Sequence, residues 1–157
     1  MGELEEAAKD FLSQRRIAVA GVSRNPKEAA NIIFRKLRDT GHDVYPINPR
    51  TTEVEGVACY PDLTSLPTPV DALVIATPPS AARALVEQCA ERGVGRVWMH
   101  RSMGSGSVSS EAADICRRHG IRVISGACPM MFCEPVDFGH KCIRWIARLT
   151  GQLPKSF

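Results

Sequence analysis

The chain has 157 residues and a formal net charge of +3, which predicts one domain that is large enough to bury its own core. Hydrophobic residues make up 44% and charged residues 24% of the sequence, a globular composition that excludes collagen-like repeats, coiled coils and disorder. No run of basic residues is longer than two, which disfavours a nucleic-acid partner. No apolar stretch approaches the roughly 20 residues of a membrane span, and the acidic N-terminus is unlike a signal peptide. We therefore expect a cytoplasmic domain without a membrane partner.

Six cysteines are scattered along the chain without a CxxC pair. A cytoplasmic domain of this size needs no disulfides, so reduced thiols are expected. Cys89 and Cys116 lie within apolar helical patterns, which predicts small core residues. The spacing of Cys133, His140 and Cys142 matches no common zinc pattern, so no metal site is predicted.

The first third of the chain predicts two helices around one buried strand. An amphipathic helix is expected at 4–14, and the continuous apolar run at 17–20 is typical of a buried parallel strand. Asn25 as N-cap and Pro26 at the first helical position predict a helix that ends before Gly41. Its buried face is expected to carry Ala29, Ile32, Ile33 and Leu37.

Strands and helices then alternate to the end of the chain. The next strand, at 43–47, contains Pro46, which lacks an N–H group and therefore predicts an edge position. A loop and a short apolar segment at 57–60 follow, and 72–76 is the clearest buried strand. The remaining elements are expected in the order helix 80–92, strand 96–99, helix 109–119, strand 121–124 and helix 136–149.

This alternation predicts a single Rossmann-like, doubly wound α/β domain over residues 1–157. We expect a mostly parallel sheet of about five strands with helices on both faces. Residues 1–16 would form its N-terminal helix, and 136–157 its C-terminal helix and tail. In such sheets ligands bind outside the carboxyl ends of the strands, so the residues that follow each strand are the candidates for a site.

The turn after the first strand has features of a phosphate-binding loop. Gly21 and Val22 allow the backbone to approach a phosphate, and Ser23 offers a hydroxyl group. The following helix would point free N–H groups at an anion, and Arg24 and Lys27 add positive charge. Two glycines of the G-x-G-x-x-G fingerprint are absent, and a simple strand-to-helix turn is the alternative interpretation.

The residues after the second strand, Asn48, Pro49 and Arg50, help to distinguish nucleotides. An NAD site needs a carboxylate here for the ribose hydroxyl groups, and none is present. Arg50 instead suits a phosphate on the adenosine ribose, as in CoA or NADP. An ordinary Asn-Pro turn is the alternative.

Three further loops are expected on the same rim. Thr77 and Pro78 would stiffen the loop that faces the adenine or pyrophosphate. His100 begins a polar loop at 100–107, and its side chain would pair with the pyrophosphate or act as an acid; a plain loop residue is the alternative interpretation. Cys128 would lie near a helix N-terminus that lowers its thiol pKa, which would allow a mixed disulfide with CoA; a buried structural cysteine is the alternative. No nucleophile–base arrangement is evident, so no catalytic residue is predicted.

The residues after the strands resemble those of the small stand-alone CoA-binding proteins, whose fold also forms the CoA-holding domain of the succinyl-CoA synthetase α subunit. Over about residues 11–133 the family patterns G-x-S-x-x-P, N-P, V-D, V-W and C-P stand as Gly21, Ser23, Pro26, Asn48, Pro49, Val70, Asp71, Val97, Trp98, Cys128 and Pro129. The family's usual Gln-Leu-Gly is replaced by His100, Arg101 and Ser102, and a C-terminal helix is added. The resemblance implies binding of coenzyme A or an acyl-CoA through its adenosine diphosphate half, with no established reaction.

Two other functions stay open at this point. An NADP-dependent oxidoreductase would use the same Arg50 but lacks the full glycine fingerprint and a second domain. A regulatory protein with a vestigial nucleotide site is the other alternative. The favoured partner is a small nucleotide ligand, and the sequence does not name an acyl group. The oligomeric state is open, because Trp145 and Ile146 on the last helix could be core residues or the interface of a homo-oligomer.

Overall fold

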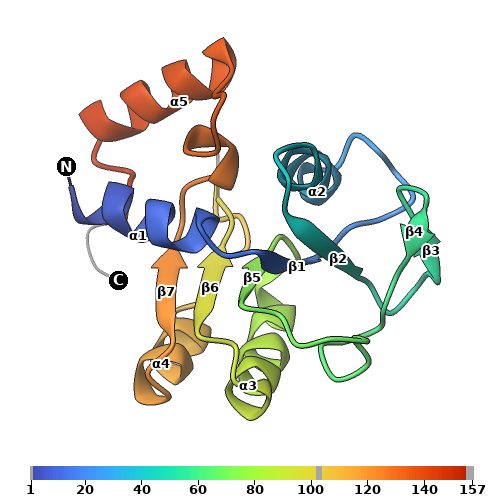
Figure 1. The fold of residues 1–157 in the computed structure, drawn as a ribbon. Coiled ribbons are helices and arrows are strands. Elements are labelled where there is room, and N and C mark those ends of the chain that lie inside the picture. The colour runs from blue at the N-terminus through green and yellow to red at the C-terminus, as the bar shows by residue number, and fades with distance from the viewer. Residues whose placement is uncertain (1, 102–103, 155–157) are drawn as a thin grey trace.

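The computed structural model describes residues 2–101 and 104–154, and it contains a parallel five-stranded sheet (Figure 1). The order across the sheet is β2-β1-β5-β6-β7. This is the predicted Rossmann-like α/β architecture. The strands are β1 (Arg16–Ala20), β2 (Asp43–Ile47), β5 (Ala72–Ile75), β6 (Arg96–Met99) and β7 (Arg122–Ser125).

Helices cover both faces of the sheet because its strands are apolar on both sides. In β1, Ile17 and Val19 join one core cluster, whereas Ala18 and Ala20 join the other. The first cluster lies under α1 (Glu3–Leu12) and α2 (Ala29–Asp39), and the second under α3 (Ala82–Arg92) and α4 (Ser110–Arg118). The short 3-10 helix η1 (Pro79–Ala81) leads into α3. A second one, η2 (Pro129–Met131), precedes the peripheral helix α5 (Phe138–Leu149).

Helix α2 begins three residues later than the sequence predicts. The side chain of Asn25 accepts a hydrogen bond from the Lys27 backbone N–H (3.1 Å), so it caps a tight turn and not the helix. Glu28 is still extended and occupies the N-cap position. The predicted buried face is also wrong in part: Ala29 and Ile32 are exposed, and Ala30 and Phe34 are buried instead.

The prediction that β2 lies at the sheet edge is confirmed. Beside it lies a small hairpin that the sequence did not predict, formed by β3 (Glu53–Val54) and β4 (Val57–Ala58). Its two turn residues, Glu55 and Gly56, both have positive φ (51° and 76°), as a type I′ hairpin turn requires. The following Tyr60 forms a bridge with Ile47, so the end of β2 is partly covered.

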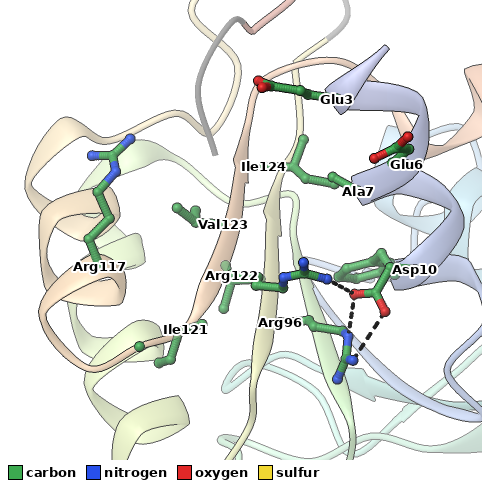
Figure 2. Close-up of a pocket in the computed structure, with 13 residues that line it drawn as sticks. Glu3, Glu6, Ala7, Asp10, Arg96, Arg117, Ile121, Arg122, Val123 and Ile124 are labelled. Atoms are coloured by element: carbon green, nitrogen blue, oxygen red, sulfur yellow. Dashed lines mark hydrogen bonds and ion pairs between the residues drawn. The ribbon is translucent and has the colours of Figure 1, made fainter. Parts of the chain in front are cut away.

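Near the amino ends of β6 and β7 lies a hollow of about 720 Å³ beside α1 (Figure 2). Three of its charged groups are paired with one another. Asp10 accepts hydrogen bonds from Arg96 (2.7 and 3.2 Å) and from Arg122 (3.0 Å). The hydrogen bond from Arg96 holds the pKa of Asp10 below its usual value, and that from Arg122 adds to the effect. This network joins α1 to the two strands.

All six cysteines are unpaired, and Cys89 and Cys116 are fully buried. Their predicted place in the core is therefore confirmed. Across the two described segments, no helix has the length and apolar character needed to cross a bilayer.

Candidate ligand-binding cleft

A second hollow of about 720 Å³ opens at the carboxyl ends of β1, β2 and β5. The order in which strands are added to the sheet reverses here, because β2 lies on one side of β1 and β5 on the other. Ligands of doubly wound sheets bind at such a switch point. Seven predicted site residues line this hollow, which we call the switch-point cleft: Gly21, Ser23, Asn48, Pro49, Arg50, Thr77 and Pro78.

Gly21 directly follows β1 and lies against the residues that follow β5. Its N–H donates to the Ile47 carbonyl (2.9 Å), and its φ is +105°. A Cβ atom at this position would lie 2.5 Å from the Ala76 carbonyl oxygen, which is far inside contact distance. Only glycine fits both restrictions, and its bare backbone forms part of the cleft wall.

Asn48 joins the loops that follow β1 and β2. Its Nδ2 donates to the Val22 carbonyl (3.0 Å), and its Oδ1 accepts from the Arg50 N–H (2.9 Å). The Val22 side chain itself is fully buried in the core. Asn48 therefore both lines the cleft and links the two loops by hydrogen bonds, and it fixes the position of the Arg50 backbone.

A buried side chain that the sequence analysis missed, Asn31 of α2, fixes the loop after β1. Its Oδ1 accepts from the Ser23 N–H (2.9 Å), and its Nδ2 donates to the Ser23 carbonyl (2.7 Å). The Ser23 hydroxyl oxygen accepts from the Asn25 N–H (3.1 Å). Because a hydroxyl group also has a proton to donate, Ser23 retains a donor for a ligand.

The same Asn31 connects the loop to the hairpin. Its Nδ2 also donates to Glu55 (2.8 Å), and Arg35 forms an ion pair with the same carboxylate oxygen (2.7 Å). The signal in the sequence was a polar residue in the apolar run of α2, since buried polar side chains are nearly always hydrogen-bonded. Its partner Glu55 could not be identified from local sequence.

Positive charge lies around the mouth of the cleft. Arg50 lines it, Lys27 is exposed, and Arg24 lines an adjoining shallow hollow by the hairpin. Within residues 2–101 and 104–154, none of the three forms an ion pair with another side chain. Two carboxylates also line the cleft, Glu28 at the N-cap of α2 and Asp62 in the loop before β5.

One polar atom in the cleft lacks a partner. The Thr77 hydroxyl oxygen is buried without a hydrogen bond from any described residue. A buried hydroxyl group in that state is destabilising by roughly 1–3 kcal/mol. A ligand in the cleft that offers a polar atom to Thr77 would remove this penalty.

His100 lies outside the cleft, at the end of β6. It is 9% exposed, and its backbone N–H donates to the Ile75 carbonyl (2.9 Å). Burial, and secondly the neighbouring His140, lower the pKa of His100, which favours a neutral imidazole over a cation that would pair with pyrophosphate. In the predicted loop 100–107, Ser102 and Met103 lie outside the described residues.

Cys128 is also absent from the cleft lining. It is 3% exposed and packs in the core cluster under α1 and α2, so the interpretation as a buried structural cysteine is confirmed. The predicted lowering of its pKa is wrong, because burial raises the pKa of this thiol to about 12. The helix that follows it, η2, has only three residues.

Comparison with known proteins agrees with this architecture. A family model described as a CoA binding domain matches residues 15–134. The alpha subunit of ADP-forming acetate–CoA ligase II from Pyrococcus furiosus is 32% identical over 126 residues, which are 75% of this chain and 27% of that subunit. The uncharacterized protein YneT of Bacillus subtilis is 26% identical over 76% of this chain and 87% of its own length.

Solved structures give the same picture. A hypothetical protein from Pyrococcus horikoshii OT3 has a TM-score of 0.78 and 28% identity, over 84% of this chain and 91% of that one. The dinucleotide-forming acetyl-coenzyme A synthetase 1 of Ca. Korarchaeum cryptofilum, in complex with phosphate and ADP, has a TM-score of 0.60 and 30% identity. The match covers 71% of this chain and 25% of the synthetase. Since the family match spans most of its length, the chain belongs to the CoA-binding domain family.

Proposed function

We propose that the chain is a binding module that holds coenzyme A or an acyl-CoA in the switch-point cleft through its adenosine diphosphate half. The observation that carries this proposal is that one cleft is lined both by the bare backbone of Gly21 and by Arg50, which follows β2. An NAD site would have a carboxylate after this strand. The chain spans about a quarter of the ligase subunit it matches (27%). The activity of that subunit is therefore not part of this proposal.

The pyrophosphate would lie against the loop after β1. Gly21 removes the side chain that would hold the ligand away, and the Ser23 hydroxyl group would donate to a phosphate oxygen. The first residues of α2, Ala29 and Ala30, line the same side of the cleft, so the positive end of the helix would face the anion.

The 3′-phosphate of the ribose would be recognised by Arg50, whose guanidinium group suits a phosphate and has no competing ion pair among the described residues. Arg24 and Lys27 would raise the local potential without direct contact. The opposite wall carries small apolar side chains, Ala81 and Ala84, which suit the flat face of an adenine. There Thr77 would gain the hydrogen-bond partner it lacks, and the rigid Pro78 would limit movement of the wall.

The far end of the ligand would extend toward the end of β6, where we place the predicted residue His100, whereas Cys128 is buried in the core and has no ligand contact in this proposal. We propose binding without catalysis, because the described residues that line the cleft include neither histidine nor cysteine. The six unpaired thiols fit a reducing compartment, and we therefore assign the protein to the cytoplasm.

The proposal is tested by thermal unfolding with equal excesses of CoA, dephospho-CoA, NADP and NAD. A ligand that binds only the folded state adds about 2.7 kcal/mol of stability at 100 times its dissociation constant. We expect the largest shift with CoA, a smaller one with dephospho-CoA and none with NAD.

A shift with NADP alone would instead support an oxidoreductase, which Arg50 also permits through the 2′-phosphate. No shift with any of the four ligands would support a regulatory protein with a vestigial site. Either result would overturn the proposal.

A further inference from the structure

One wall of the switch-point cleft is a stripe of η1 and α3. Four lining residues follow one another at intervals of three, one and three positions, namely Ala81, Ala84, Leu85 and Gln88, and this spacing places them on one face of the helix. The stripe starts beside the loop after β5, against which Gly21 lies. It is apolar until its last residue, Gln88, which lies about 10 Å further along the helix than Ala81.

The carboxylate of Asp62 lies beside the far end of this stripe. Gln88 Oε1 accepts a hydrogen bond from the Leu63 backbone N–H (3.0 Å), which holds the peptide group after Asp62 against α3. The Asp62 Oδ1 atom accepts from the Ser65 N–H (2.8 Å) and from the hydroxyl groups of Thr64 and Ser65 (both 2.7 Å). The second oxygen, Oδ2, has no hydrogen bond from any described residue, and Asp62 lines the cleft.

An ionised carboxylate at this place restricts which ligands the cleft accepts. Hydrogen bonds from the Thr64 hydroxyl group, and secondly from that of Ser65, lower the pKa of Asp62, so its carboxylate is charged at neutral pH. A charged carboxylate accepts hydrogen bonds and donates none. It would repel the phosphates of a ligand and favour a hydrogen-bond donor at the other end of the same molecule.

We propose that Asp62 selects the base of the ligand by accepting a hydrogen bond from the 6-amino group of adenine. This inference rests on the proposed CoA binding and extends it, because it assigns a residue that recognises the base. With the phosphates beside Gly21, the base would lie on the α3 stripe and its amino group would reach Oδ2 of Asp62. The Gln88 Nε2 atom, which also has no partner among the described residues, would donate to a ring nitrogen next to the amino group.

The test compares CoA with its purine analogue, in which hydrogen replaces the 6-amino group of adenine. The two ligands share every phosphate and every ring nitrogen, so the ratio of their dissociation constants isolates the amino group. Hydrogen bonds to a charged group are stronger than those between neutral groups. We therefore expect calorimetry to show that the unmodified chain prefers CoA by about tenfold or more.

Asp62→Asn assigns this preference to the carboxylate. The new side chain has the same shape, and its Oδ1 atom can still accept from the Ser65 N–H, so that its Nδ2 donor replaces Oδ2 and faces the amino group. We expect the preference for CoA to disappear. Because the loss of a negative charge changes the affinity for any anion, the ratio for the two ligands is the readout and not either affinity alone.

Glu28→Gln is the matched control, since it removes the other carboxylate that lines the cleft, at the N-cap of α2. It should change the affinity for both ligands by the same factor and retain the tenfold preference. A purely structural role of Asp62 in its turn would have this same signature in Asp62→Asn, with both ligands weakened equally.

Three results would overturn the inference, and only one of them affects the proposed function. Equal affinity of the unmodified chain for CoA and its purine analogue would show that the amino group is not recognised, although CoA binds. A preference that persists in Asp62→Asn would assign the recognition to another residue. Binding of neither ligand to the unmodified chain would overturn the proposed function together with this inference.

Discussion

Two hollows of equal size, about 720 Å³ each, lie in very different electrostatic surroundings. In the hollow by α1, the carboxylate of Asp10 is already satisfied by Arg96 and Arg122 (Figure 2). In the switch-point cleft, the Thr77 hydroxyl group has no partner among the described residues, and the Arg50 guanidinium has no ion pair there. The volume of a cavity is therefore a poor guide to its role, whereas unpaired polar groups and bare backbone point to a ligand.

The comparison also separates stability from binding. The Asp10 network joins α1 to the starts of β6 and β7, so its loss should reduce folding stability alone. The cleft combines residues that hold its shape, such as Gly21 and Asn31, with Arg50, whose guanidinium group forms no ion pair among the described residues. Substitutions at the two hollows should therefore have distinct effects on unfolding and on CoA affinity.

The largest effect is expected for Gly21→Ala. Its methyl group would lie 2.5 Å from the Ala76 carbonyl oxygen in a residue with φ of +105°, so clash and backbone strain act together. We expect a loss of about 3–5 kcal/mol in the free energy of unfolding, measured with urea. In the control Gly41→Ala, φ is +96° but the methyl group meets no atom within 4 Å, and the loss should be about 1 kcal/mol. Equal losses would show that the close approach to β5 is unimportant.

Asn31→Leu should be nearly as damaging. It removes the partner of the Ser23 N–H and carbonyl groups and of the Glu55 carboxylate, which leaves polar groups unsatisfied near the cleft. We expect a loss of about 3 kcal/mol in unfolding free energy and weaker CoA binding. The exposed Asn25→Ala is the control, and its loss should stay below about 1 kcal/mol. A stable Asn31→Leu protein with normal CoA affinity would contradict the role of Asn31 as the anchor of this loop.

Asp10→Asn should lower stability in a pH-dependent way and leave CoA affinity unchanged. Because the folded-state pKa of Asp10 is lowered, its ionised form adds stability above the unfolded pKa. That contribution is lost as the pH falls through the folded pKa. We expect a difference of about 1–2 kcal/mol from the unmodified chain at neutral pH, which disappears once the pH has fallen below the folded-state pKa of Asp10. A difference that is constant with pH would show that ionisation of Asp10 is not the cause.

Arg50→Ala should have the smallest effect on stability and a selective effect on binding. We expect CoA affinity, measured by calorimetry, to fall about tenfold, which corresponds to about 1.4 kcal/mol. Affinity for dephospho-CoA, which lacks the 3′-phosphate, should not change. Arg117→Ala, a variant of an arginine that lines the other hollow, should bind CoA normally. If Arg50→Ala weakened both ligands equally, its proposed contact with the 3′-phosphate would be wrong.

The sequence by itself determined the type and order of the main elements. Continuous apolar runs indicated buried parallel strands, Pro46 indicated the edge position of β2, and Gly21 marked the turn beside the cleft. These signals are local, because a few neighbouring residues set the hydrophobic period and the allowed backbone angles. The same local reasoning placed α2 too early, since it assigned Asn25 to a helix cap when the side chain caps a turn.

Only the tertiary structure decided which rim residues share a cleft and which are buried elsewhere. The order of strands places β1 beside β5 and thereby brings Gly21 to Thr77, whereas β6 and β7 carry His100 and Cys128 away from the lining. The contact of Asn31 with Glu55 joins residues 24 positions apart, and the pKa of Cys128 follows from the core packed around it. Long-range packing sets these features, because no local pattern in the sequence specifies that Glu55 contacts Asn31 or which residues surround Cys128.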